Sequence, residues 1–201
     1  MNVEEFLDRL NDLYLPPENA FTFIDVPEIR YAAIEGRGNP ESEEFEQARK
    51  WLFSIVHVIK PVVKKRMGNR YAEPPLEYLF WGDNDQDFIS GDKDCWNWRV
   101  MIAFIDWITD QDFYNAVGVV EQKLGQAPVS LQLVTYNEGK SVQITHIGDY
   151  SKVPEICSEL YEDFLPKNGL HPAGPYHEIY LNDPNRTAPA KRRMVIRQPV
   201  S

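Results

Sequence analysis

Two stretches of the sequence resemble each other and decide the fold: PPLEYLF at residues 74–80 and PYHEIYL at residues 175–181. Both begin with Pro-x-x-Glu and continue into apolar residues of the kind that form β-strands. An internal repeat of this kind predicts two similar modules, here related by a pseudo-two-fold axis. Such an axis would place Glu77 and Glu178 at equivalent positions. Chance also produces matches of four letters, so the surrounding elements have to agree with the repeat.

The hydrophobic pattern around the first stretch predicts one helix and three strands. A long helix with one buried face is indicated by apolar residues at alternating spacings of three and four, namely Phe45, Ala48, Leu52, Ile55 and Ile59. Pro61 is expected to perturb or end this helix. The strands of this half are expected at residues 29–36, 76–81 and 96–104.

The second half repeats the order of the first. We expect a hairpin around Asn137-Glu138-Gly139, then a helix and two further strands. These segments fall at residues 129–135 and 140–147 for the hairpin, 153–164 for the helix, and 176–181 and 192–197 for the strands. The sequence therefore predicts an α+β fold of tandem strand-helix-strand-strand modules with pseudo-two-fold symmetry, in which antiparallel sheets are backed by helices.

A length of 201 residues suffices for one large domain or for two small ones that share a core. The predicted boundaries are residues 1–20 for an N-terminal helical extension, 21–201 for the main domain and, within it, about 21–108 for module one, about 109–125 for a linker helix and about 128–201 for module two. Thr109 is expected to cap the linker helix, with Asp112 as its capping-box partner.

Charge and composition argue against several functional classes. A net charge of −10 repels phosphate backbones, so no nucleic-acid partner is expected. Two cysteines, Cys95 and Cys157, imply no disulfide framework, and four histidines form no HExxH pattern, so neither a metal nor another cofactor is expected. Neither a signal peptide nor an apolar run of the ~18 residues needed for a membrane span is found. We therefore expect a cytoplasmic protein without a membrane partner, and the oligomeric state stays open.

Aromatic residues make up 12% of the chain and include five Trp and ten Tyr. These side chains combine a large apolar surface with a polar tip, which suits both cores and ligand pockets. Trp96 and Trp98 would lie on one face of a strand, where they either form a stacking platform or seal a core. Trp81 ends the preceding strand, and Tyr71 lies in the loop before that strand.

Glu178 is the charged residue with the most informative surroundings. Side chains alternate along a strand, so His177, Ile179 and Leu181 would share one face and Glu178 and Tyr180 the other. The two apolar residues mark the first face as the core. Glu178 would then be either a surface carboxylate or a carboxylate in a cavity, where it would hold a cation beside ring faces or act as a general base.

Several segments together resemble the GyrI-like small-molecule-binding domains, in their stand-alone branch. The resemblance is carried by residues 36–40 (GRGNP), 74–81 (PPLEYLFW), 96–98 (WNW), 138–148 (EGKSVQITHIG), 177–183 (HEIYLND) and 197–200 (RQPV). It implies that residues 21–201 form a ligand-binding domain with a pocket at the module junction. Family members include effector domains of multidrug-sensing transcription regulators, and some stand-alone members resemble hydrolases of cyclopropane-bearing cytotoxins.

The resemblance also implies roles for individual residues. Glu178 matches the pocket glutamate that meets cationic aromatic ligands, and together with Tyr180 it would carry any catalysis. From the strand pattern, the internal repeat and the resemblance together, we expect the ligand to be held by Tyr71, Glu77, Trp81, Trp96, Trp98 and Glu178. The expected partner is thus a hydrophobic aromatic small molecule, and the setting is xenobiotic defence.

Three functions follow from this reading. The first is a hydrolase that opens electrophilic small molecules, with Glu178 as the general base. The second is a module that senses or sequesters aromatic cations without turnover. The third, which explains the aromatic residues least well, is a protein inhibitor that acts through its acidic surface. The sequence does not separate the first two, because both use the same residues.

Overall fold

The computed structural model of the chain describes residues 8, 11, 13–18, 20–67, 73–83, 92–104 and 106–201. Two compact units make up the chain: unit 1 consists of Met1–Glu28 and Asn137–Ser201, and unit 2 of Ile29–Tyr136. Most of the predicted N-terminal helix lies outside the described residues. No helix in the described part of the chain is long and apolar enough to cross a membrane.

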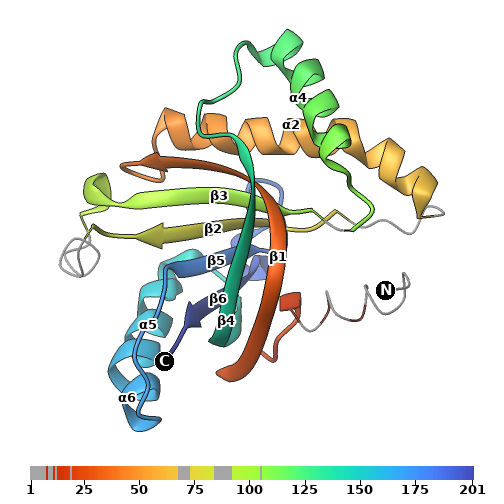
Figure 1. Cartoon of the computed structure of the whole chain (residues 1–201). Coiled ribbons are helices and arrows are strands. Elements are labelled where there is room, and N and C mark those ends of the chain that lie inside the picture. Colours follow the sequence, from red (N-terminus) through yellow and green to blue (C-terminus); the bar gives the residue numbers. More distant parts are fainter. Residues whose placement is uncertain are drawn as a thin grey trace. The chain divides into compact units, whose positions relative to one another are not determined.

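Unit 2 contains a three-stranded antiparallel sheet in the order β1-β3-β2 and two helices (Figure 1). Its elements are β1 (Thr22–Arg37, which begins in unit 1), α2 (Glu43–Arg66), β2 (Leu76–Trp81), the 3-10 helix η1 (Lys93–Cys95), β3 (Asn97–Ala103) and α4 (Asp110–Leu124). Helix α4 packs against α2, and the predicted capping box of Thr109 and Asp112 opens it.

Helix α2 forms where the apolar spacing predicts it. The Ser42 side chain accepts a hydrogen bond from the backbone N–H of Phe45 and so caps the first turn. Pro61 lies inside the helix without ending it, and α2 continues to Arg66. Buried Ile59 and Val63 anchor the helix on both sides of the proline, and this packing compensates for the backbone hydrogen bond that a proline cannot make.

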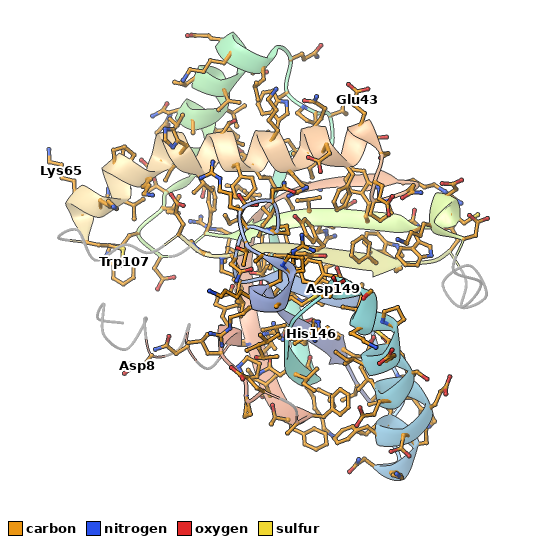
Figure 2. All side chains as sticks on the ribbon, turned by 180° about the vertical axis from the view of Figure 1, so that it is seen from behind. Asp8, Glu43, Lys65, Trp107, His146 and Asp149 are labelled. Atoms are coloured by element: carbon orange, nitrogen blue, oxygen red, sulfur yellow. The ribbon has the colours of Figure 1, made fainter. Side chains whose placement is uncertain are left out.

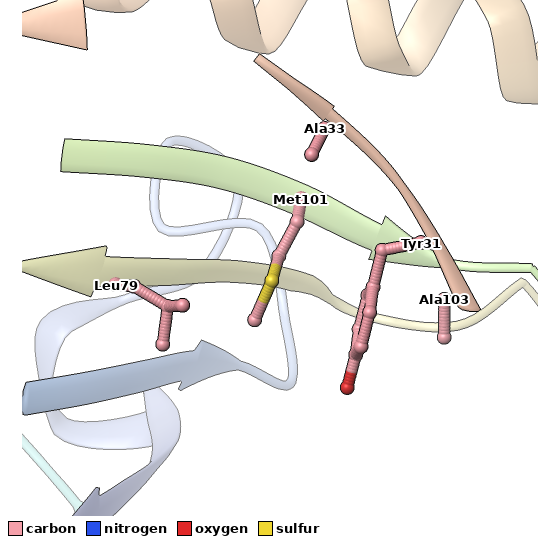
Figure 3. Close-up of a cluster of buried hydrophobic side chains, with 5 residues drawn as sticks. All are labelled: Tyr31, Ala33, Leu79, Met101 and Ala103. Atoms are coloured by element: carbon pink, nitrogen blue, oxygen red, sulfur yellow. The ribbon is translucent and has the colours of Figure 1, made fainter. Parts of the chain in front are cut away.

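The two faces of the unit 2 sheet are covered differently. Tyr78 and Trp98 face α2, and the Phe45 ring of that helix lies 5.2 Å from the first ring and 5.1 Å from the second, centroid to centroid. The opposite face carries a separate cluster of buried side chains (Figure 3), which consists of Tyr31, Ala33, Leu79, Met101 and Ala103. Both faces of this sheet are therefore buried, which explains its nearly continuous apolar sequence.

Unit 1 contains a second three-stranded antiparallel sheet, in the order β4-β6-β5. Its elements are β4 (Gln132–Ile147, which begins in unit 2), the 3-10 helix η2 (Tyr150–Lys152), α5 (Val153–Ser158), the π-helix η3 (Glu159–Phe164), α6 (Leu165–Lys167), β5 (Tyr176–Tyr180), the 3-10 helix η4 (Pro189–Lys191) and β6 (Arg193–Pro199). Each unit thus holds strand, helix, strand and strand in that order, and the predicted α+β fold with antiparallel sheets is confirmed.

Two details of unit 1 differ from the sequence prediction. The predicted hairpin around Gly139 is one continuous strand, β4, in which Gly139 takes a left-handed backbone conformation with φ of +66°. Glycine adopts this conformation without strain, so the strand continues through a position where a turn was expected. The helix predicted at residues 153–164 continues to Lys167 and changes from α to π geometry at Glu159.

The internal repeat has to be shifted by one residue. In unit 2, Tyr78 faces α2, so Glu77 points to the opposite face of the sheet. In unit 1, Glu178 lies on the face that α5 covers. On that face Cys157 of α5 contacts Tyr176, the tyrosine two residues before Glu178. Strand alternation then makes His177, and not Glu178, the counterpart of Glu77. The shared letters Pro-x-x-Glu therefore do not mark equivalent positions.

A network of charged and amide groups fills the other face of the unit 1 sheet. Glu138 accepts hydrogen bonds from His177, at 2.8 Å, and from the Arg197 guanidinium, at 3.1 Å. Arg197 also donates to the Gln143 side chain, at 3.0 Å, and to the backbone carbonyl of Leu13. All four of the side chains are buried. Burial alone would raise the pKa of Glu138, but the neighbouring His177 and Arg197 outweigh it and lower the pKa to about 2.

We predict that Glu138→Gln lowers the free energy of unfolding by about 3 kcal/mol near neutral pH, because it leaves the buried Arg197 without a counter-charge. The folded pKa of Glu138, about 2, lies below its ordinary 4.5, so its contribution is full above pH 4.5 and is lost as pH falls towards 2. Urea unfolding across this pH range should therefore show wild type and variant converging. Glu162→Gln, at an exposed position, is the control and should change little; a constant gap between wild type and Glu138→Gln would contradict the account.

Candidate functional site

Strand β5 places three polar side chains on its α5-facing side. Tyr176, Glu178 and Tyr180 alternate along the strand, and Glu178 is half-buried. The Tyr176 hydroxyl donates to one carboxylate oxygen of Glu178 at 3.0 Å, and the Tyr180 hydroxyl donates to the other at 2.8 Å. Both oxygens of the carboxylate are thus oriented by phenols of its own strand.

The helix that covers this face adds a thiol and a further phenol. The Cys157 sulfur lies 3.6 Å from the Tyr176 hydroxyl oxygen. One turn later, the Tyr161 hydroxyl donates to the Gln198 side chain at 2.6 Å. Gln198 in turn donates to the carbonyl of Gly174 at 2.9 Å. Tyr161 therefore fastens the π-helical segment to the sheet beside Glu178.

Tyr150 reaches this region from the turn between β4 and α5. Figure 2 labels His146, near the end of β4, and Asp149, in this turn; the Asp149 carbonyl oxygen lies 3.0 Å from His146 Nε2. The Tyr150 ring contacts Tyr180 edge to face, with centroids 5.4 Å apart. The Arg192 guanidinium carbon lies 5.2 Å from the Tyr150 ring centroid. We call Tyr150, Cys157, Tyr176, Glu178 and Tyr180 the Glu178 cluster.

The environment keeps the phenols and the thiol around Glu178 protonated. Burial, reinforced by the charge of Glu178, raises the pKa of Tyr150 to about 12 and that of Cys157 to about 11. The same two causes raise the pKa of Tyr161 and of Tyr176 above the ordinary tyrosine value. At neutral pH these groups are hydrogen-bond donors, and Cys157 is a thiol without the reactivity of a thiolate.

This arrangement suits binding of a ligand that brings a polar or charged atom close to the aromatic rings of the site. A carboxylate beside ring faces attracts cations, and it also accepts a proton from a bound water. The neutral phenols are positioned to donate to acceptor atoms. Within the described residues, no group of three or more His, Cys, Asp or Glu side chains is placed to hold a metal ion.

The other predicted site residues belong to unit 2, apart from Tyr71, which lies outside the described residues. Glu77 is fully buried, and the Tyr31 hydroxyl lies 3.4 Å from its carboxylate. Trp81 is half-buried and packs against the cluster of Figure 3. The structure thus brings Glu178 and Tyr180 together, and a role for Glu77 or Trp81 in ligand binding stays a prediction.

Trp96 and Trp98 lie on the α2 side of unit 2, as strand alternation predicts. Trp98 is fully buried, and a Cβ atom at Gly36 would lie only 2.2 Å from its indole ring. Trp96 is half-buried and packs on Phe80 at 5.6 Å. The sequence left open whether these two residues form a stacking platform or seal a core. Trp98 has the surroundings of a core residue, whereas ligand contact by Trp96 stays a prediction.

Three members of the Glu178 cluster were missed by the sequence analysis. Tyr176 shares its strand face with Glu178 at a spacing of two, so the same alternation argument would have found it. Cys157 occupies a helix position that only tertiary packing brings to β5. Tyr150 lies in a short turn without periodicity, and the sequence carries no signal for it.

We predict that Cys157, isolated in a Cys95→Ser variant, reacts about a hundredfold more slowly with iodoacetamide in the folded chain than in urea near neutral pH. The pKa of about 11, against the ordinary 9.0, leaves about a hundredth of the thiolate. The rate in the folded chain should keep rising with pH up to about 11. Mass spectrometry of the alkylated chain provides the measurement, and equal rates in folded and unfolded protein would refute the burial of this thiol.

Comparison with known proteins identifies similar structures and a matching family. Three crystal structures from Listeria innocua are similar over nearly the whole chain. An uncharacterized conserved protein is 30% identical with a TM-score of 0.82, covering 98% of each chain. Two proteins described as hydrolases are 29% identical with a TM-score of 0.78, covering 98% of each chain, and 27% identical with a TM-score of 0.75, covering 100% of each.

A comparison with curated proteins gives no significant match. The profile of one family, described as the GyrI-like small molecule binding domain, matches residues 19–201, which is nearly the whole chain. This match covers both sheets and all members of the Glu178 cluster. The chain belongs to the GyrI-like small-molecule-binding domain family.

Proposed function

We propose that the chain binds an aromatic, cationic or electrophilic small molecule at the Glu178 cluster, and that Glu178 acts as a general base in the hydrolysis of strained electrophiles. The observation that carries this proposal is the orientation of both Glu178 oxygens by the Tyr176 and Tyr180 hydroxyls. A carboxylate held in this way needs no reorganisation before it meets a cation or a water molecule.

Binding of an aromatic molecule is supported by the surroundings of the carboxylate. Tyr180 and Tyr150 present ring faces and edges next to Glu178, and rings stack with aromatic ligands in offset or edge-to-face geometry. A ligand cation would gain from the carboxylate and from the quadrupoles of the rings together. The family to which the chain belongs is defined by small-molecule binding, which agrees with this assignment.

Hydrolysis is supported by the two similar proteins described as hydrolases. In the reaction proposed for this chain, the substrate is a cyclopropane conjugated with a carbonyl group. The oxygen of a water molecule bonds to a cyclopropane carbon while Glu178 accepts a proton from that water. The strained carbon–carbon bond breaks, and its electron pair moves to the carbonyl oxygen, which is then protonated. The product is an alcohol, and this chemistry would remove electrophilic cytotoxins.

Binding without turnover is the second candidate. It is favoured by the family description, which names binding and no reaction. A sequestering or sensing protein would use the same carboxylate and the same rings, but it would release the ligand unchanged. The two candidates differ only in whether the bound water attacks the ligand, so product analysis separates them.

We predict that Glu178→Gln abolishes hydrolysis of a cyclopropane spiro-fused to a cyclohexadienone, because an amide does not take a proton from water. The product, para-hydroxyphenethyl alcohol, is followed by mass spectrometry. The same variant should bind trimethyl(naphthylmethyl)ammonium about tenfold or more weakly, since it loses a charge of opposite sign beside the cation. Its affinity for the uncharged analogue neopentylnaphthalene should stay nearly the same.

The melting temperature checks that the variant is folded. A glutamine keeps one acceptor oxygen, and the second tyrosine hydroxyl can rotate to accept from the amide, so stability should be unchanged or slightly higher. Glu162→Gln serves as the matched control, because Glu162 is an exposed carboxylate of the same unit. Loss of cation binding without any product from the wild type supports the second candidate. Wild-type activity and affinity in Glu178→Gln would refute both.

A further inference from the structure

The Tyr150 hydroxyl differs from the other hydroxyls around Glu178. Tyr176 and Tyr180 donate to the carboxylate, and Tyr161 donates to Gln198. The Tyr150 hydroxyl oxygen is also buried, yet it has no hydrogen-bond partner among the described residues. A buried hydroxyl without a partner loses its hydration and gains nothing in return, so it weakens the folded state.

The position of the Tyr150 ring is nevertheless well determined. Tyr180 contacts it edge to face, and the Arg192 guanidinium lies over it. The residue opens the short helix η2, which the Asp149 carboxylate caps by accepting from the Ser151 backbone N–H at 2.9 Å. Packing thus holds the ring beside the carboxylate although its hydroxyl is unsatisfied. Unfavourable buried groups of this kind are expected at functional sites, where a ligand completes them.

We propose that the Tyr150 hydroxyl is the donor that recognises an acceptor oxygen of the bound molecule, an inference that rests on the proposed function of the Glu178 cluster. The ligand class is thereby narrowed to aromatic molecules that carry a carbonyl or similar acceptor near the ring that meets Tyr180. Because the hydroxyl is shielded from solvent without ligand, binding has to displace the groups that cover it or turn the Tyr150 side chain.

The same donor suits the charge that develops during hydrolysis. When water bonds to the cyclopropane carbon and the strained bond breaks, the carbonyl oxygen takes the electron pair and becomes a phenolate. A hydrogen bond from Tyr150 to this oxygen is stronger in the transition state than in the ground state, because the negative charge grows there. The phenolate then takes one proton from solvent, and Glu178 releases to solvent the proton that it accepted from the attacking water, so that the protons balance. Burial keeps Tyr150 protonated, since it raises the pKa to about 12.

The test compares Tyr150→Phe, which keeps the ring and removes the hydroxyl, with Tyr161→Phe, which removes a hydroxyl that has a partner. Two probes of nearly the same shape are titrated by calorimetry: acetylnaphthalene, which carries a carbonyl, and isopropenylnaphthalene, which carries a methylene group in its place. We expect Tyr150→Phe to weaken binding of the ketone about tenfold and to leave binding of the hydrocarbon within about twofold. Turnover of the spiro-fused dienone should fall in kcat by at least the same factor.

Melting temperatures distinguish this role from a purely structural one. Tyr150→Phe should melt at the same or a higher temperature than the wild type, because it removes an unsatisfied buried hydroxyl. Tyr161→Phe should melt about 2–4 °C lower, because it breaks a partly buried hydrogen bond, and should keep the ratio of the two probe affinities. A fall in melting temperature for Tyr150→Phe would indicate that its hydroxyl has a structural partner and would overturn the inference.

Glu178→Gln with the cationic and neutral probes, measured in parallel, separates failure of the inference from failure of the proposed function. If Glu178→Gln loses the cation selectively while Tyr150→Phe weakens both naphthalenes equally or neither, the inference is wrong and the proposed function stands. If neither variant affects any probe, the proposed function fails as well. A wild-type protein that binds the hydrocarbon but not the ketone, or neither of them, also overturns the assignment of Tyr150 as a carbonyl donor.

Discussion

Strand β5 carries ionisable side chains on both of its faces, and unit 1 is organised around partners for them. His177 and Glu178 are consecutive, so alternation sends them to opposite sides of the sheet. On one side, Glu138 and Arg197 form a buried network with His177, which also holds the backbone at Leu13. On the other side, phenols surround a carboxylate. Buried charges are costly without partners, so each face constrains the choice of neighbouring residues.

The two faces of the sheet have different roles, one structural and one in the proposed binding. The Glu138 network is closed, because charge meets opposite charge and its atoms are shielded from water; such a network specifies one register of strands β4, β5 and β6. The Glu178 face combines a carboxylate with neutral donors and ring surfaces, a set of groups that suits contact with a ligand cation or with a water molecule. The Glu138 network thus holds one face of the sheet rigid, and the rigid sheet positions the polar groups around Glu178 on the other face, as accurate binding requires.

Much of this organisation follows from the sequence. Helical spacing predicted α2, and strand alternation placed Tyr180 beside Glu178 and His177 on the core face. The predicted bounds of β2 agree with the structure. The hairpin prediction failed at Gly139, because a glycine with positive φ occurs both in turns and in bends of a continuous strand. Pattern alone does not reveal Cys157 or Tyr150, since packing between distant segments brings them to β5.

The central claim is that a small molecule binds against Glu178, and a crystal structure of the protein with trimethyl(naphthylmethyl)ammonium tests it most directly. The account predicts that the trimethylammonium group forms an ion pair with the Glu178 carboxylate and that the naphthalene lies against the Tyr180 ring. The Tyr176 and Tyr180 hydroxyls should still donate to the carboxylate. A cation bound elsewhere, with the Glu178 cluster unchanged and unoccupied at saturating concentration, would contradict it.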